Sequence, residues 1–239
     1  MANHSLITLV KSGFKSPRLV LRFLRGLDPS GFELTEIEKI SGTPAVIIEA
    51  GAFNGVDTLK MSKFWPEAKV FAFEPIPELY DEAKLLTSGH NQIELFPFAL
   101  VNSDRKRVKI NTFYDTENKH GSSSILEPAL HLKVAPQVKF DRVMSVPACR
   151  LDDWYSGMNG MTVDLLWLDL QGAELEVLKS GLNCLKNTRT LHVEVSLESL
   201  YDGAPTFEEL HAFLLAKEFH LVEVRIPVLS GNAIYIQDI

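Results

Sequence analysis

The sequence predicts an α/β fold with a mostly parallel β-sheet and helices on both faces. Short apolar runs rich in β-branched residues alternate with segments whose apolar residues recur at helical spacing. This alternation is typical of strand–helix–strand units with parallel strands. The nearly continuous apolar run over residues 163–169 fits a central strand that is covered on both faces. The last two predicted strands are joined by a short link, so they must be antiparallel.

The first half of the sheet is predicted from residue 45 onward. The AVIIEA run over residues 45–50 is the first strand, and the helix over residues 56–65 ends before Pro66. The KVFAF run over residues 69–73 is the second strand. A helix over residues 77–86 and a third strand over residues 93–100 follow.

The segment over residues 105–150 interrupts the alternation. Residues 107–114 and 142–148 are expected to be strands, and the loop over residues 115–124 is polar. A long irregular insert in a compact domain usually has a function or is mobile. We therefore interpret it as a lid on the substrate side of a binding site.

Regular alternation returns after the insert. Thr206 precedes Glu209 by three residues, and this capping box marks the start of a helix. The remaining predicted elements are a strand over 163–169, a helix over 174–180, a strand over 190–196, a helix over 206–218, and strands over 219–226 and 232–237 around a turn at Ser230, Gly231 and Asn232.

The first 44 residues form a separate N-terminal extension in this interpretation, and residues 45–239 form the main domain. Residues 1–27 hold five basic residues and no acidic residue, and their apolar side chains recur at helical spacing after Pro17. The resulting basic amphipathic helix could cap the core or the mouth of the active site. It could also make a peripheral contact with a membrane surface or a partner.

Charge and composition exclude several classes of function. The net charge of −7 argues against nucleic acid as the main partner, because nucleic-acid binding depends on basic residues. No stretch approaches the ~20 apolar residues of a transmembrane helix, and no secretory signal is evident. Cys149 and Cys184 stand in no motif and are expected to be reduced, so we expect a cytoplasmic protein.

A glycine-containing turn after the first strand is the clearest candidate binding site. Gly51 and Gly55 allow close approach of the backbone, and the next helix offers free N–H groups at its start. In a parallel sheet this turn lies at the carboxyl edge, where ligands bind. Glu74 follows the second strand, and its carboxylate could accept hydrogen bonds from both hydroxyls of a ribose.

The spacing of this turn distinguishes two classes of cofactor. A dinucleotide-binding enzyme would have G-x-G-x-x-G and a pyrophosphate at the helix start. This chain has E-x-G-x-x-x-G, in which the negative Glu49 suits the ammonium of a methionyl group. S-adenosylmethionine therefore fits better than NAD, and an NAD-dependent dehydrogenase is the disfavoured alternative.

Several segments resemble the FkbM-type methyltransferases. The most specific is DLQGAE, which runs from Asp169 to Glu174 at the end of a central strand. The others are IIEAGAFNG at 47–55, FEP at 73–75, GSSS at 121–124, RLDDW at 150–154 and GNAIYI at 231–236. The resemblance spans about residues 45–239.

This resemblance implies a Rossmann-like class I methyltransferase fold, with seven strands and an antiparallel C-terminal hairpin. It also implies S-adenosylmethionine as cofactor and O-methylation of a sugar, a natural-product intermediate or another small hydroxylated molecule. The implied cofactor contacts are Glu49, Gly51, Asn54 and Gly55 at the methionyl end, Glu74 and Pro75 at the ribose, Phe98, Ala99 and Leu100 at the adenine, and Asp169 beside the methyl group or the acceptor.

Three residues are candidates for the catalytic base that takes the acceptor's proton: Asp169, His192 and Glu194. Asp169 ends an apolar strand at the ligand edge, although it could instead cap the next helix or bind the cofactor. His192 and Glu194 lie on one face of the next strand. Asp169 and Glu194 could together bind Mg²⁺, but no third ligand is evident, so a metal is not favoured.

The insert supplies four candidate residues on the substrate side. His120 could contact the acceptor or be exposed to solvent, and Ser122, Ser123 and Ser124 could close over the cofactor or only form the loop. The expected partner is a small-molecule acceptor. A non-catalytic protein that binds a partner through its basic N-terminal helix is the alternative function, and the oligomeric state stays open.

Overall fold

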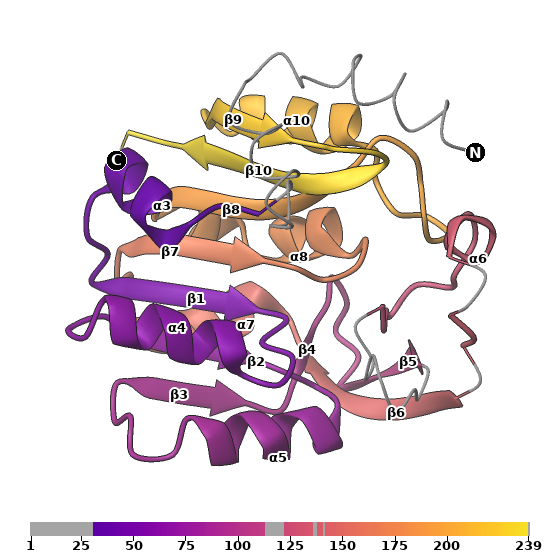
Figure 1. Cartoon of the computed structure of the whole chain (residues 1–239), viewed down its shortest axis with the longest axis horizontal. Helices are drawn as coiled ribbons and strands as arrows, with labels where there is room; N and C mark the ends of the chain where they lie inside the picture. Colours follow the sequence, from indigo (N-terminus) through magenta and orange to yellow (C-terminus); the bar gives the residue numbers. More distant parts are fainter. Residues whose placement is uncertain (1–30, 113–121, 136–137, 141, 239) are drawn as a thin grey trace.

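The fold is described from a computed structural model of the chain (Figure 1), which describes residues 31–112, 122–135, 138–140 and 142–238. The predicted basic helix within residues 1–27, and most of the polar loop over residues 115–124, lie outside this part. Among the described residues no helix is both long and apolar enough to cross a bilayer. Cys149 and Cys184 are both free.

The main sheet has seven strands in the order β3-β2-β1-β7-β8-β10-β9 (Figure 1). Only β10 runs against the others, because β8 and β9 each pair with it in the antiparallel sense. This arrangement confirms the predicted mostly parallel sheet with an antiparallel C-terminal hairpin. The strands are β1 (Val46–Ala50), β2 (Lys69–Phe73), β3 (Ile93–Phe96), β7 (Val163–Leu168), β8 (Thr188–Ser196), β9 (His220–Arg225) and β10 (Ser230–Ile236).

Helices cover both faces of this sheet (Figure 1). On one face, α3 (Leu34–Ser41) and α4 (Val56–Phe64) pack their buried Ile37 and Met61 against a cluster that contains Ile47, Leu165 and Ile234. The opposite face of the sheet packs against residues of four further helices in a larger apolar cluster. These helices are α7 (Leu151–Tyr155), α8 (Glu174–Ser180), α9 (Leu182–Lys186) and α10 (Phe207–Leu215).

The remaining described helices are short or peripheral. They are α5 (Pro77–Leu86), α6 (His131–Val134) and the 3₁₀ helix η1 (Ser156–Met158). The capping box predicted for α10 is present, because the Thr206 side chain accepts from the backbone N–H of Glu209 and the Glu209 side chain returns to Thr206. This helix ends at Leu215, three residues before the predicted end.

The single strand predicted over residues 93–100 is wrong. The chain forms β3 in the main sheet and then β4 (Ala99–Leu100) in a second sheet. Pro97 stands between them, and a proline has no N–H to donate to a strand ladder. The second sheet has the order β4-β6-β5, with β5 (Arg107–Thr112) and β6 (Arg142–Cys149) supplied by the insert.

The turn predicted at Ser230, Gly231 and Asn232 is also wrong. These residues begin β10, and the chain reverses over residues 226–229 instead. The glycine is required for another reason, since a Cβ at Gly231 would lie 1.8 Å from the carbonyl oxygen of Arg225. A glycine in a sequence can thus indicate a close approach between strands as well as a turn.

Candidate active site

The carboxyl ends of the parallel strands open into one cavity of about 550 Å³. The loops after β1, β2 and β7 line it, together with residues of the second sheet and the segment that precedes α3. Ligands bind at this edge in open α/β sheets, because the loops after neighbouring strands converge there. The site predicted from the sequence is therefore a real hollow in the fold.

The turn after β1 packs tightly against the end of β7. Gly51 has a φ of +94°, and a Cβ there would lie 1.9 Å from the carbonyl oxygen of Asp169. Asp169 in turn donates its N–H to the Ala50 carbonyl at 3.0 Å. Gly55 does not line the cavity. A Cβ there would lie 2.9 Å from Ala83, so the glycine allows the start of α4 to pack against α5. Contact within the protein thus explains both glycines.

Glu49 lies at the bottom of the cavity with only 2% of its surface exposed. Its carboxylate accepts a hydrogen bond from the buried hydroxyl of Thr58. Burial raises the pKa of Glu49 to about 8, because the low-dielectric surroundings disfavour its charge. A positively charged group beside it would reverse this effect and stabilise the ionised carboxylate.

Glu74 follows β2 and connects two turns of the site. One carboxylate oxygen accepts the N–H of Phe53 at 2.9 Å, and the other accepts the N–H of Ile76 at 2.8 Å. Burial nevertheless raises the pKa of Glu74 to about 8. Each oxygen keeps a further lone pair for a ligand hydroxyl.

A group of four side chains joins the ends of β7 and β8. The Gln171 amide nitrogen donates to Asp169 Oδ1 and to Glu194 Oε2, at 2.9 Å each. The hydroxyl oxygen of Tyr201 lies 3.3 Å from the Gln171 side-chain oxygen. Gln171 has a φ of +52°, so the backbone adopts a left-handed conformation where the amide bridges the two acids.

The carboxyl groups of Asp169 and Glu194 also interact with each other, and each affects the pKa of the other. Burial and the neighbouring Asp169 raise the pKa of Glu194 well above its usual value. Burial raises the pKa of Asp169 as well, although its side chain reaches solvent through the cavity. Of the two acids, Glu194 holds its proton more strongly, and Asp169 is the one that lines the main cavity.

The described part of the insert is tied to this group. Ser124 Oγ donates to the backbone carbonyl of Gln171 at 2.9 Å, and the Tyr201 hydroxyl donates to the carbonyl of Ser122 at 2.9 Å. Ser123 and Ser124 line the cavity, whereas Ser122 does not. His120 lies outside the described residues.

The structure brings most of the predicted cofactor residues together. All of them except Gly55 line the cavity: Glu49, Gly51, Asn54, Glu74, Pro75, Phe98, Ala99, Leu100 and Asp169. Of the other catalytic candidates, His192 lines the same cavity, and Glu194 lines a small neighbouring one of about 30 Å³.

Several lining residues were not predicted. Gly31 and Phe32 come from a segment without a recognisable motif, and no binding role was predicted for Trp167 or for Asn232, although Asn232 stands in the GNAIYI run. Gln171 stands inside the DLQGAE run, but one of the two acids that it bridges, Glu194, lies on another strand, so the run gave no signal of this role. Segments distant in sequence meet here only through the tertiary fold.

The chemistry of this cavity suits a cationic ligand with hydroxyl groups. Glu49, Glu74 and Asp169 all line it, and each has a pKa raised by burial. When ionised, these acids would repel a pyrophosphate, and an ammonium or sulfonium group bound beside them would favour their ionised form. The described residues include no group of three or more His, Cys, Asp or Glu side chains placed to hold a metal ion.

Comparison with known protein families agrees with this geometry. The model of the methyltransferase FkbM domain matches residues 49–221, which is more than half of the chain. The chain belongs to the FkbM methyltransferase family. The match begins at Glu49 in the cavity and ends within β9.

Two curated relatives are similar over part of their length. The 2-O-methyltransferase NoeI of Sinorhizobium fredii is 35% identical over 162 residues, covering 66% of this chain and 66% of NoeI. The methyltransferase sdnD of Sordaria araneosa is 28% identical over 152 residues, covering 56% and 59%. The chain therefore spans less than two thirds of either relative.

Solved structures are more distant. A methyltransferase from Aquifex aeolicus that depends on S-adenosylmethionine is 14% identical, with a TM-score of 0.45 over 87% of this chain and 90% of that one.

Proposed function

We propose that this protein transfers a methyl group from S-adenosylmethionine to a hydroxyl group of a small molecule, such as a sugar or a natural-product intermediate. Membership of the FkbM family supports the reaction class. The similarity to a 2-O-methyltransferase supports oxygen as the accepting atom. The observation that carries the proposal is the acid-lined cavity at the carboxyl edge of the sheet.

The cofactor contacts follow from the geometry of that cavity. In this proposal Glu49 holds the ammonium of the methionyl group, since a cation compensates for its burial. Glu74 accepts hydrogen bonds from the ribose hydroxyls, because backbone N–H groups already fix its two oxygens in place. Phe98 and Leu100 provide the apolar wall for the adenine.

Asp169 is the proposed general base. S-adenosylmethionine bound here would supply an electrophilic methyl group, and the acceptor hydroxyl must lose its proton as the new bond forms. Asp169 faces the cavity, and its raised pKa makes it a stronger proton acceptor than an ordinary aspartate. Glu194 and Gln171 do not take this proton; they hold the Asp169 carboxylate in one orientation.

Calorimetric titration with S-adenosylmethionine and S-adenosylhomocysteine tests the proposal. We expect micromolar binding of both and no binding of NAD. Glu74→Gln should weaken both by about tenfold or more, since an amide NH₂ would replace one of the two oxygens that accept hydrogen bonds. The exposed Glu94→Gln on β3 is the matched control and should bind as the unchanged protein does. Absence of binding would contradict the proposal and favour the non-catalytic, partner-binding alternative.

A further inference from the structure

The proposed cofactor contacts do not occupy one end of the cavity. In the sheet, Glu49 pairs with Trp167, and Trp167 pairs with His192, so the three side chains lie in one row on one face. His192 is two strands from Glu49, which corresponds to about 10 Å at the usual strand spacing. The adenine wall lies in the opposite direction, beyond β2. His192 therefore belongs to a different region of the cavity.

The imidazole of His192 is buried without a partner. It is 2% exposed, and neither ring nitrogen has a hydrogen-bond partner among the residues that the structure describes. Its ring stacks on Trp167 with centroids 3.8 Å apart, and both residues line the cavity. Leaving buried polar atoms unpaired is costly, so this arrangement is suited to a group that arrives from the cavity.

The chemistry of that group follows from the state of the ring. Burial and then the charge of Arg225 lower the pKa of His192 to about 3, so the ring is neutral. A neutral imidazole offers one donor and one acceptor. An alcohol hydroxyl likewise donates one hydrogen bond and accepts others. His192 is thus a poor base but a good match for a hydroxyl group.

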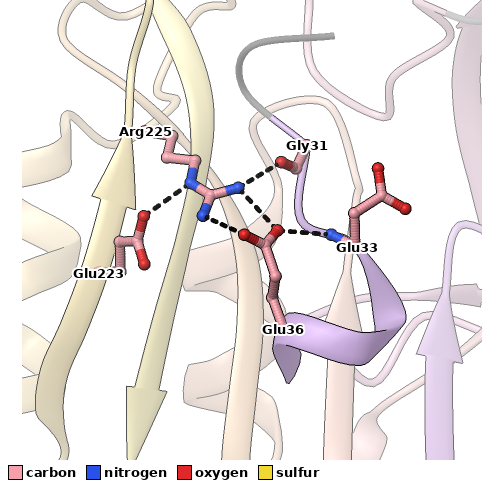
Figure 2. Close-up of polar contacts among 5 residues, drawn as sticks. All are labelled: Gly31, Glu33, Glu36, Glu223 and Arg225. Atoms are coloured by element: carbon pink, nitrogen blue, oxygen red, sulfur yellow. Dashed lines mark hydrogen bonds and ion pairs between the residues drawn. The ribbon is translucent and has the colours of Figure 1, made fainter. Parts of the chain in front are cut away.

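Arg225 holds the wall next to His192 in place. Its guanidinium donates to the carbonyl of Gly31 at 2.8 Å and pairs with Glu36 at 3.2 Å and Glu223 at 2.8 Å (Figure 2). The guanidinium carbon lies 3.9 Å from the ring centroid of Phe32. The Phe32 ring in turn meets His192 edge-on at 5.7 Å.

This wall is formed partly from outside the common part of the family. Phe32 precedes the family match over residues 49–221, and Arg225 follows it. The cofactor contacts proposed above all lie inside the match. Residues outside the shared domain can therefore distinguish one acceptor from another without changing the cofactor contacts.

We propose that the cavity end between Phe32, Trp167 and His192 is the acceptor subsite, in which His192 hydrogen-bonds a hydroxyl group of a sugar-like ring. Residues 31–34 determine which acceptor fits, and Arg225 is a positioning residue that acts through Phe32. This inference rests on the proposed function, because it needs the cofactor at the Glu49 end of the same cavity.

Nitrogen NMR on protein labelled at its histidines tests this subsite. The protein is saturated with S-adenosylhomocysteine and titrated with methyl glycosides of glucose, galactose, mannose, fucose and rhamnose. His192→Phe identifies the His192 signals. At least one glycoside should move them and should bind about tenfold more weakly to His192→Phe. The affinity for S-adenosylhomocysteine should stay unchanged, and the exposed His220→Phe should behave as the unchanged protein.

Arg225 has its own readout in the same experiment. Arg225→Met should raise the pKa of His192 and weaken glycoside binding. Arg225→Lys should leave the pKa of His192 and the glycoside affinity closer to those of the unchanged protein, because the positive charge remains. A glycoside that binds without moving the His192 signals would overturn the subsite, as would the failure of every glycoside to bind. Failure of S-adenosylhomocysteine to bind would instead overturn the proposed function. The glycosides would then be titrated into the protein alone, and the response of the His192 signals would decide whether they bind at this end of the cavity.

Discussion

At the scale of single residues, Asp169 differs from its neighbours in the site by combining exposure to the cavity with two hydrogen bonds that orient it. A base needs both access to the substrate and a pKa near the working pH. Glu194 has the raised pKa but not the access, because it lines the small adjoining cavity.

We predict that Asp169→Asn lowers turnover by about 10²- to 10⁴-fold, the usual contribution of a positioned base. The side chain keeps its size and can still accept from Gln171, so the cofactor affinity should change little. Methyl transfer to an identified acceptor, together with calorimetry, measures the two effects. Asp153→Asn is the control, because Asp153 is exposed and distant from the cavity lining. Unchanged turnover in Asp169→Asn would remove Asp169 from the role of base.

At the scale of elements, a side chain of the RLDDW stretch caps a different helix from the one in which it stands. Acidic residues in the first turn of a helix usually stabilise that helix, and Asp152 and Asp153 stand in the first turn of α7. Instead, the Asp152 carboxylate accepts the backbone N–H groups of Asn183 and Cys184, which begin α9, at distances of 3.0–3.1 Å. Asp152 thereby connects α7 to the start of α9 beneath the sheet.

We predict that Asp152→Ala lowers the free energy of unfolding by about 1–2 kcal/mol, the usual cost of losing a helix cap. Asp153→Ala removes a carboxylate from the same helix and should change the stability by less than about 0.5 kcal/mol. Urea denaturation of both variants measures the difference. Equal stability of the two variants would show that the cap contributes nothing.

At the scale of the whole molecule, the acids around the cavity make stability depend on pH. Glu49 and Glu74 have pKa values of about 8 in the folded protein against an ordinary value of 4.5. The folded state therefore binds more protons than the unfolded state between these values. Their contribution to stability is fully present below pH 4.5 and is lost as the pH rises through 8.

We predict that the melting temperature without ligand falls between about pH 5 and about pH 9, and that Glu49→Gln reduces the fall. Each pKa unit corresponds to about 1.4 kcal/mol, so the effect of one group is at most several kcal/mol. S-adenosylmethionine should restore more stability at the higher pH, because its positive groups favour the ionised acids. Thermal melts of the unchanged protein, Glu49→Gln and Glu94→Gln measure this. A fall of the same size in Glu49→Gln would contradict the prediction.

Much of the main sheet could be predicted because its signals are local. The β1 and β7 strands are nearly continuous apolar runs, each interrupted by one acid, and the α10 capping box lies within four residues. Glu49 is the next-to-last residue of β1, and Glu74 and Asp169 directly follow β2 and β7, so the strand pattern placed all three at one edge. The errors at Pro97 and Gly231 arose because each residue is compatible with two local structures.

The sequence by itself thus determined the fold class with its mostly parallel sheet, the acidic character of the site and the family resemblance. Only the tertiary structure decided which side chains meet across the sheet. Gln171 bridges Asp169 and Glu194 because β7 and β8 pair in one particular register. Arg225 reaches Phe32 across 193 positions of the chain because β9 and β10 return beside α3. Contacts between residues so far apart depend on packing and register, which no local pattern of residues encodes.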